Sequence, residues 1–338
     1  MLSPREALFD PADEPPALPV CDHYSGVEAR MRKSLELQGE MGPVFDVTLD
    51  SEDGAPVGAE IEHAHLIAEL VMSPANLHGR VGARIQPVGH ARFDAIVELL
   101  VQHAGARLAY LMIPKVHGLA ELQRAVDAVD AASLRAGLAR RIPLHALVET
   151  HGALREVNAL AAHPRIESLS FGLMDFVSAH RGAIPETAMG AQGQFEHPLI
   201  LRAKLEIAAA CHGHAKVPSH CVVTEFKHAR KLQDAAETAC RRLGYTRMWS
   251  IHPSQIRPIV DAFSPSTAEV DQAIEIIGAA QAAGWAPIRY RQAGEDRLHD
   301  RASYRYFWQV LQRAHRTSVH GGEQLPAEVR AAWFPEGA

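Results

Sequence analysis

Acidic and basic side chains stand at the ends of several apolar runs of strand length, a placement that could create a metal site. Glu149 directly follows the run 144–148, and Asp175 follows the run 166–171 after a short turn. If these runs are neighbouring parallel strands, the two carboxylates converge, and such oxygen ligands suit a hard divalent cation such as Mg²⁺. Arg84, near the end of another run, would direct a positive charge at the same volume, where it could hold a carboxylate or a developing oxyanion.

Other charged residues follow these runs as well. Glu52 and Asp53 come after the second run and could orient the water molecules of the cation. Lys115, after the fourth run, is expected to be solvated or paired, because nothing nearby in the sequence provides the apolar setting that Schiff-base chemistry needs. Each acid taken alone could cap a helix or pair with a surface arginine, and Arg84 could be half of a structural ion pair. The joint pattern favours the metal site.

The apolar runs alternate with amphipathic stretches. Eight strand-like runs lie at 18–21, 44–49, 81–85, 108–113, 144–148, 166–171, 217–223 and 248–251. Helical candidates between them include 63–71, 93–103, 119–135, 154–162, 199–211 and 229–243. Eight such repeats predict an α/β fold, a closed (β/α)8 TIM barrel, with the chemistry at the carboxyl ends of its strands. An open doubly wound sheet is less favoured, because the first strand is not followed by a glycine-rich phosphate turn.

Two further helical stretches, 267–283 and 302–315, follow the eighth run. A closed barrel does not need them, and no proline-rich or low-complexity linker separates them from it. We therefore expect a catalytic barrel domain over residues 1–260 and a C-terminal helical extension over 261–338. The extension could cover the barrel or pack on a neighbouring subunit.

The composition excludes several classes of protein. The chain has 338 residues, 34 Lys and Arg against 40 Asp and Glu, a formal net charge of −6, and no apolar run near the ~20 residues of a membrane helix. No long basic stripe is present, so no nucleic-acid partner is expected, and no membrane partner either. The start MLSPREALFD lacks the apolar core of a secretory signal, and the four cysteines show no CxxC spacing. We expect a reduced, cytoplasmic protein.

A local group of thiols and imidazoles could hold zinc instead. Its members are Cys211, His212, His214, His220 and Cys221. Their spacing fits no closed structural zinc motif, and the predicted strand 217–223 would point successive side chains to opposite faces. Buried thiols and loop histidines are the favoured interpretation of this group.

Six motifs, in this order, resemble the citrate lyase β-subunit and malyl-CoA lyase family. They are LDSEDGAP (Leu49 to Pro56), ARIQP (Ala83 to Pro87), MIPKV (Met112 to Val116), VETHGAL (Val148 to Leu154), FGLMDF (Phe171 to Phe176) and SIHPSQI (Ser250 to Ile256). The similarity extends from about residue 30 to the FSPS motif at 263–266, which is most of the chain. It implies an Mg²⁺-dependent (β/α)8 barrel, a homo-trimer or hexamer, that breaks or makes a carbon–carbon bond between an acyl-CoA and an oxo acid.

The resemblance also implies roles for single residues. Glu149 and Asp175 match the two ligands of Mg²⁺, for which Mn²⁺ could substitute, and Arg84 matches the arginine that steadies the carbonyl and enolate oxygens. Glu52 and Asp53 match an acidic pair under the metal site. The implied reaction is a retro-Claisen or retro-aldol cleavage, or the reverse condensation, of a 3-hydroxyacyl-CoA such as citryl-CoA or malyl-CoA.

Further matched positions are expected to touch the substrate or the cofactor. They are Lys115, Gln86, His252 and Pro253. Some relatives bring a catalytic acid from the C-terminal tail of a neighbouring subunit. Asp296, in AGEDRLHD, is the best positional match and Asp300 the second, although either could be a solvated tail acid.

The chain departs from the family pattern at three places. Gln86 stands where asparagine is usual, Arg247 and Met248 stand where many relatives have Gly-Lys, and His220 and Cys221 stand where Ile-Asp is common. If that lysine holds the CoA phosphates in relatives, use of a thioester here is in question. A divalent-metal aldolase of free 2-oxo-4-hydroxy acids is therefore an alternative. A non-catalytic homologue that binds an acyl-CoA or a metabolite is another.

Overall fold

The computed structural model describes residues 2–10, 16–292, 294–319 and 323–335. The described residues form two compact units, one within 16–263 and one that joins those within 2–10 to those within 264–335. The sequence predicts a boundary between 260 and 261 and places the N-terminal residues in the barrel. Each unit has a core of its own and is described by itself.

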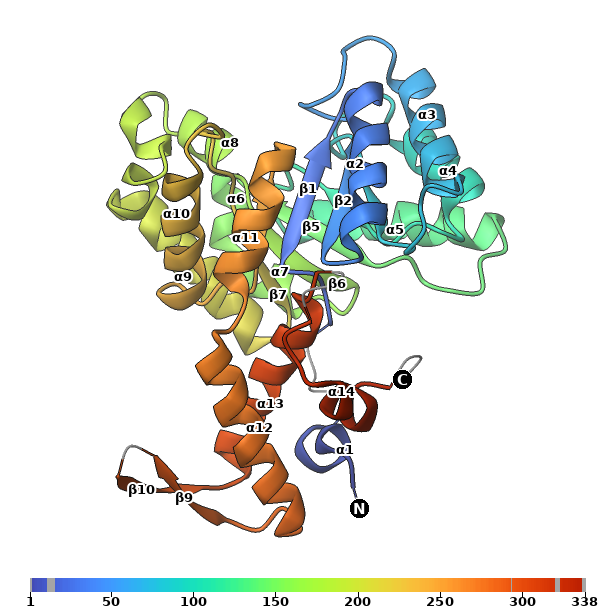
Figure 1. The fold of residues 1–338 in the computed structure, drawn as a ribbon. Coiled ribbons are helices and arrows are strands. Elements are labelled where there is room, and N and C mark those ends of the chain that lie inside the picture. The colour runs from blue at the N-terminus through green and yellow to red at the C-terminus, as the bar shows by residue number, and fades with distance from the viewer. Residues whose placement is uncertain (1, 11–15, 293, 320–322, 336–338) are drawn as a thin grey trace. The chain divides into compact units, whose positions relative to one another are not determined.

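The first unit is a closed barrel of eight parallel strands in which each strand pairs with the next and β8 pairs with β1 (Figure 1). The strands are β1 (Cys21–Ser25), β2 (Phe45–Asp50), β3 (Val81–Arg84), β4 (Leu111–Ile113), β5 (Leu144–Val148), β6 (Ile166–Phe171), β7 (Val217–His220) and β8 (Arg247–Ser250). The predicted (β/α)8 barrel is thus confirmed.

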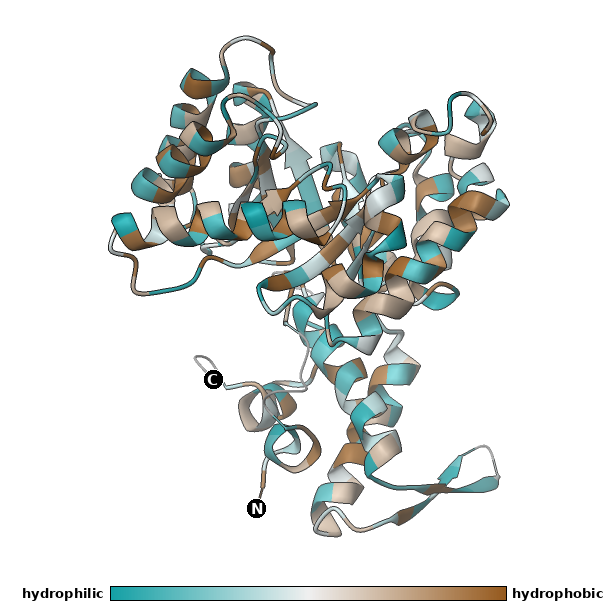
Figure 2. Ribbon diagram, turned by 180° about the vertical axis from the view of Figure 1, so that it is seen from behind, coloured by the Kyte–Doolittle hydropathy of each residue, from teal (hydrophilic) through white to brown (hydrophobic). Residues whose placement is uncertain are grey.

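Helices follow the strands and cover the outside of the barrel. They are α2 (Glu28–Met41), α3 (Glu60–Met72), α4 (Phe93–Ala104), α5 (Leu119–Arg135), α6 (His151–Arg155), α7 (Val157–Ala162), α8 (Leu173–Ser178), α9 (Pro198–Gly213), α10 (Ala229–Arg241) and α11 (Ile256–Phe263), with 3-10 helices η1 (Glu186–Met189), η2 (Gly193–Phe195) and η3 (Pro253–Gln255). The helices alternate hydrophilic and hydrophobic residues, as Figure 2 shows, because one side packs on the barrel while the other meets water.

One predicted strand was misplaced. The expected first strand, 18–21, ends where β1 begins, and the observed strand CDHYS is largely polar. Burial of Asp22 and His23 is possible because both have a partner: Asp22 lies 3.1 Å from Arg247, and the His23 ring hydrogen-bonds Ser250 at 2.9 Å. A hydropathy pattern cannot detect a strand whose buried side chains are satisfied in this way.

The barrel interior is unusually polar for this fold, whose barrels are dominated by bulky apolar residues. The register places Asp22 beside Asp46, and Asp50 beside Arg84. Tyr24 stacks on Trp249 with ring centroids 4.3 Å apart. Charged layers near both ends of the strands therefore enclose a partly aromatic middle layer.

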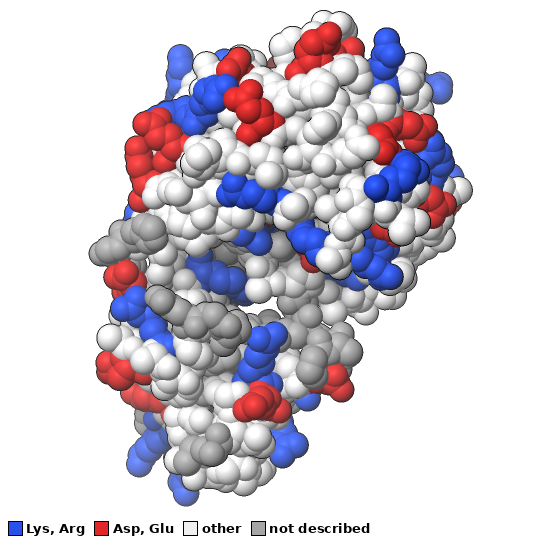
Figure 3. Space-filling model, turned by 90° about the vertical axis from the view of Figure 1, so that its right-hand side faces the viewer, with Lys and Arg blue, Asp and Glu red and all other residues white. Residues whose placement is uncertain are grey.

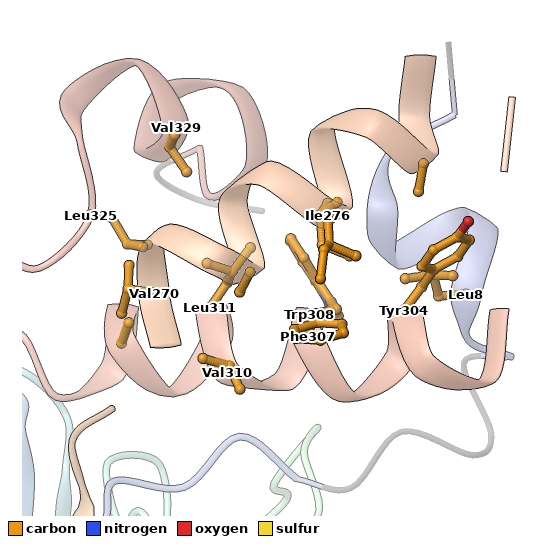
Figure 4. Close-up of a cluster of buried hydrophobic side chains, with 14 of the residues drawn as sticks. Leu8, Val270, Ile276, Tyr304, Phe307, Trp308, Val310, Leu311, Leu325 and Val329 are labelled. Atoms are coloured by element: carbon orange, nitrogen blue, oxygen red, sulfur yellow. The ribbon is translucent and has the colours of Figure 1, made fainter. Parts of the chain in front are cut away.

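The second unit has a helical core. Its elements are α1 (Pro4–Leu8), α12 (Thr267–Ala282), β9 (Ile288–Gln292), β10 (Glu295–His299), α13 (Arg301–Arg316) and α14 (Ala327–Trp333). Leu8 of α1 packs with side chains of α12 and α13, among them Ile276, Tyr304 and Trp308 (Figure 4). The predicted helices 267–283 and 302–315 thus exist.

The β9–β10 hairpin was not predicted from the sequence. Its two strands pair in antiparallel register, and most of their residues are exposed or half-buried. The hairpin is mostly hydrophilic in Figure 2. It therefore lacks the alternating apolar pattern by which a strand is predicted.

Within the described residues, no helix combines the length and the apolar character needed to cross a membrane. The face of the molecule in Figure 3 carries both signs of charge, with acidic groups beside basic ones.

Candidate active site

Glu149 follows β5 at the carboxyl end of the barrel and is almost fully buried, with 2% of its surface exposed. Its Oε1 atom accepts a hydrogen bond of 2.7 Å from the backbone N–H of Lys115. Burial, and then the nearby Asp175 carboxylate, raise the pKa of Glu149 to about 8. A Cβ atom at Gly172 would overlap Glu149 Oε2, so the glycine keeps this space open for the carboxylate.

Asp175 lies in the first turn of α8, just beyond the carboxyl end of β6. Its side chain is 39% exposed, and its Oδ1 atom is 3.7 Å from Lys115 Nζ. Because β5 and β6 are neighbours, the Asp175 carboxylate lies close enough to Glu149 to raise its pKa. The structure thus brings the two predicted ligands together, one buried and one open to solvent.

Arg84, the last residue of β3, is buried and held by acids on two sides. It donates to both carboxylate oxygens of Asp50, from Nε at 2.7 Å and from Nη2 at 2.5 Å, and its Nη1 lies 3.1 Å from Glu52 Oε2. Burial alone would lower the pKa of Arg84, but the Asp50 and Glu52 carboxylates raise it above its ordinary value. The guanidinium is therefore a fixed, permanent positive charge beside the two acids.

Lys115 follows β4 and connects the remaining acids. Its Nζ atom lies 2.5 Å from Glu52 Oε1 and 2.9 Å from Asp53 Oδ2. Burial alone would lower the pKa of Lys115, but the hydrogen bonds that its ammonium donates to Glu52 and Asp53 raise it above the ordinary value. Burial raises the pKa of Glu52. Lys115 is thus a paired residue, one of the two roles expected from the sequence, and Glu52 and Asp53 lie between it and Arg84.

The other matched positions have different surroundings. Gln86 is buried, and its amide donates to the backbone oxygen of Ser51. His252 and Pro253 follow β8 and are exposed; the His252 ring stacks on Phe226 with centroids 4.8 Å apart. Gln86 therefore supports the loop that carries Glu52, whereas the two residues after β8 face solvent.

Asp296 and Asp300 belong to the second unit. Asp296, in β10, forms an ion pair with Arg289 of β9 and is 39% exposed. Asp300 is the N-cap of α13: its side chain accepts from the backbone N–H of Ala302 at 3.0 Å, and Ser303 completes a capping box. This contact gives Asp300 a structural role, while the catalytic role of Asp296 stays a prediction.

Arg247 is fully buried near the amino end of the barrel. Its Nη1 lies 2.5 Å from Asp46 Oδ2 and its Nη2 lies 3.1 Å from Asp22 Oδ2. The Tyr110 hydroxyl and the Thr48 hydroxyl also donate to Asp22, at 2.9 and 2.6 Å. An arginine enclosed in this way is unavailable to a phosphate in solution.

The zinc hypothesis has no support in the geometry. Among the described residues, no group of three or more His, Cys, Asp or Glu side chains is arranged to hold a metal ion. His220 stacks on Phe195, and His212 hydrogen-bonds the backbone oxygen of Gly244 at 2.7 Å. The buried thiols Cys211 and Cys221 agree with the favoured interpretation, whereas His212 lies in α9 and His220 is buried in β7, so these two are not the loop histidines that were expected.

A cation bound by only two protein carboxylates fits Glu149 and Asp175. Mg²⁺ is commonly held by one or two carboxylates, with water and substrate oxygens completing its octahedron. The repulsion of Glu149 by the Asp175 carboxylate favours a dication between them, and Gly172 leaves the Glu149 carboxylate the room it needs. Two contacts in the candidate site could not be predicted from the sequence. The ion pair between Asp50 and Arg84 depends on the β2–β3 register, and the contacts of Lys115 depend on its backbone conformation.

A closed (β/α)8 barrel with acids and a fixed arginine at the carboxyl ends of its strands has the arrangement of the enzymes of this fold, whose active sites lie at that end. The chain belongs to the HpcH/HpaI aldolase/citrate lyase family, whose model matches residues 45–253. It is a member of a lyase family, and the resemblance found in the sequence is confirmed.

Individual relatives agree with this assignment. The L-malyl-CoA/β-methylmalyl-CoA lyase of Rhodobacter capsulatus is 30% identical over 241 residues, which are 66% of this chain and 72% of the relative. A crystal structure of a citrate lyase from Burkholderia xenovorans LB400 is 50% identical with a TM-score of 0.83, covering 98% of this chain and 100% of the other. Protein CitE of Mycobacterium tuberculosis, in complex with magnesium, acetoacetate and coenzyme A, has a TM-score of 0.66 at 20% identity over 88% of this chain and 98% of the other, and so shares the fold.

Proposed function

We propose that this protein is an Mg²⁺-dependent carbon–carbon lyase that cleaves a 3-hydroxyacyl-CoA, such as malyl-CoA or citryl-CoA, to acetyl-CoA and an oxo acid, or catalyses the reverse condensation. The observation that carries the proposal is the convergence of Glu149 and Asp175 beside a permanently charged Arg84. The malyl-CoA lyase relative and the CitE complex with magnesium and coenzyme A support this choice of reaction and cofactor.

Glu149 and Asp175 would hold Mg²⁺, with Mn²⁺ as an alternative. When bound, the cation would act as a Lewis acid on the oxygens of the oxo acid. Asp175 is open to solvent, so a substrate could approach the site from the side of this acid. Buried Glu149 is kept in place by the backbone N–H of Lys115 and by the space at Gly172.

Arg84 would stabilise the enolate oxygen of the departing acyl group. Asp50 and Glu52 fix its guanidinium in advance, so the positive charge needs no reorganisation as the negative charge develops. Lys115, Gln86, His252 and Pro253 are the proposed substrate or cofactor contacts around this centre. Glu52 and Asp53 would orient water molecules on the cation.

The enolate carbon must also receive a proton. We assign this step to Asp296, on the exposed β9–β10 hairpin, whose carboxylate would serve a neighbouring subunit of a trimer or hexamer. In this arrangement the C-terminal unit would contact the barrel of a second copy. Size measurement in solution and complementation between an Asp296→Asn chain and an active-site variant would test the assignment.

A second candidate is a divalent-metal aldolase that acts on free 2-oxo-4-hydroxy acids. Enclosure of Arg247 near the amino end of the barrel favours it, because this arginine cannot replace the lysine expected to bind CoA phosphates. A non-catalytic homologue is less favoured, because a binding protein has no need of both metal ligands and the fixed arginine together.

The decisive experiment is an assay of purified protein with malyl-CoA, citryl-CoA and related 3-hydroxyacyl-CoA thioesters, in Mg²⁺ or in EDTA. We expect release of both acetyl-CoA and an oxo acid, with Mg²⁺ only, and its loss in Glu149→Gln. Release of free CoA without an oxo acid would indicate plain thioester hydrolysis. Cleavage of free 2-oxo-4-hydroxy acids, with no turnover of any thioester, would establish the aldolase instead.

A further inference from the structure

Lys115 is the one residue in the candidate site that contacts both proposed metal ligands and both neighbouring acids. Its backbone N–H donates to Glu149, and its ammonium lies 3.7 Å from Asp175 Oδ1. The same ammonium contacts Glu52 at 2.5 Å and Asp53 at 2.9 Å. A single residue, through its backbone N–H and its ammonium, thus joins acids that follow three different strands, β2, β5 and β6.

The backbone at Lys115 is held in a conformation that a lysine seldom adopts. Its φ angle is 51°, in the left-handed region where residues other than glycine, asparagine and aspartate are uncommon. Such a conformation persists when surrounding contacts enforce it, and it is often found at functional sites. Here it points the N–H at Glu149 while the side chain turns towards the acids after β2. A relaxed backbone would have to give up one of these contacts.

The charge around Lys115 is strongly unbalanced. Five acidic side chains at this end of the barrel meet two cationic side chains, Arg84 and Lys115; the acids are Asp50, Glu52, Asp53, Glu149 and Asp175. Arg84 is occupied by Asp50 and Glu52. The ammonium is therefore the cation that lies nearest to Asp175 in the described structure.

We propose that Lys115 is a positioning residue that competes with the divalent cation for the carboxylates of this site. The inference rests on the proposed metal site. Without metal, the ammonium lies between Asp53 and Asp175 and offsets part of their charge. When metal binds, Asp175 is shared with a dication, and the ammonium keeps Glu52 and Asp53. Lys115 thereby weakens metal binding and keeps the metal-free site folded. Its charge also reduces the negative charge that an anionic oxo acid would meet in the site.

The test is Mn²⁺ binding, measured from the spectrum of free Mn²⁺ in electron paramagnetic resonance. Lys115→Met removes the charge but keeps a side chain of similar length and the same backbone strain. We expect it to bind Mn²⁺ roughly tenfold more tightly, the effect of removing one positive charge near a dication in a solvated site. Lys115→Arg, which keeps the charge, should bind Mn²⁺ like the wild type.

Lys33→Met is the matched control, because it makes the same change in net charge at an exposed lysine paired with Glu36. Its Mn²⁺ affinity should equal that of the wild type. A second readout is thermal stability: metal-free Lys115→Met should melt below the wild type, and saturating Mn²⁺ should raise its Tm by more. Lys115→Gln repeats both measurements if Lys115→Met does not fold.

The outcomes separate this inference from the proposed function. A wild type that binds no Mn²⁺ would overturn the metal site and this inference with it. A wild type that binds Mn²⁺, with equal or weaker binding by both neutral variants, would overturn the role of Lys115 alone. Tighter binding by the neutral variants, with Lys33→Met unchanged, would establish the competition.

Discussion

The two ends of the barrel carry ion networks built from the same kinds of side chain, yet they differ in exposure and in charge balance. At the amino end, Arg247 binds Asp22 and Asp46, and all three side chains are fully buried. Arg80 adds a second contact to Asp46, at 2.7 Å. Two acids therefore meet two arginines and the charges balance, with Arg247 fully buried and Arg80 partly exposed.

At the carboxyl end, five acids meet Arg84 and Lys115, and the network opens to water at Asp53 and Asp175. The acids of the amino-end network are buried and already paired, which leaves no excess charge for a ligand and indicates a structural role. The network at the carboxyl end is accessible to solvent at Asp53 and Asp175, and its excess of acidic groups favours binding of a cation. The two ends thus differ in charge balance and in the exposure of their acids to solvent, and not in the kinds of ionic residue they contain.

The largest expected effect is at the structural end. Arg247→Met should lower the free energy of unfolding by about 3–5 kcal/mol, because it leaves Asp22 and Asp46 buried with only Arg80 beside them. Urea denaturation would measure the loss. Arg32→Met, at an exposed pair with Glu28, is the control and should change the free energy of unfolding by less than about 1 kcal/mol.

A loss in Arg247→Met no greater than that of the control would show that the buried network is not structural. The combined variant Asp22→Asn, Asp46→Asn, Arg247→Met sharpens the test. It removes the unpaired charges together, so it should recover part of the stability that Arg247→Met loses.

Arg84→Met should have the opposite profile, a large loss of activity with a smaller loss of stability. Removing a preorganised group that stabilises an oxyanion commonly lowers kcat by about 10²–10³. Asp50 would still accept the backbone N–H groups of Glu52 and Gly54, both at 2.9 Å, and Lys115 would still pair with Glu52. Assays of kcat beside urea denaturation measure both quantities. A loss of stability as large as that of Arg247→Met would contradict the distinction between the two ends.

Most of the barrel could be predicted because its strands are short apolar runs with helices between them. The prediction of 119–135 as a helix coincides with α5, and the strands at 144–148 and 166–171 coincide with β5 and β6. The strand β1 and the β9–β10 hairpin were not predicted. β1 buries polar residues and the hairpin pairs exposed ones, so neither has the hydropathy pattern by which a strand is predicted.

The site was predictable to the extent that it depends on single positions at strand ends. Glu149, Asp175 and Arg84 could be selected because each lies near the end of an apolar run or within a short turn after it. The clamp of Asp50 on Arg84 requires the β2–β3 register, and the bridge made by Lys115 requires a positive φ angle. Neither the register nor a backbone dihedral is encoded in the spacing of one motif, so these contacts appear only in the folded chain.

Removal of metal should affect one end of the barrel and leave the other unchanged. Mg²⁺ at 100 times its Kd should raise the free energy of unfolding by about 2.7 kcal/mol relative to EDTA, because it binds only the folded chain. Urea denaturation with Mg²⁺ and with EDTA measures the difference. Glu149→Gln should abolish it, whereas Thr48→Val, which alters only the contacts to Asp22 and Tyr110, should retain it in full. Equal Mg²⁺ effects in the wild type and in Glu149→Gln would remove the reason for treating the carboxyl end as a cation site.

The smallest expected effect concerns Lys204 in α9, a buried cation whose described contacts are neutral, unlike those of Arg247. Its Nζ donates to Gln194 Oε1 at 2.7 Å and lies 4.0 Å from the centre of the Phe195 ring. Burial lowers the pKa of Lys204 from 10.5 to about 8, so between these values the unfolded chain binds more protons than the folded chain. The free energy of unfolding should therefore rise as the pH increases from 8 to 10, by on the order of 2 kcal/mol. Lys204→Met should flatten this rise in urea titrations, and parallel curves for the two proteins would show that the folded chain stabilises a charged Lys204 as fully as water does.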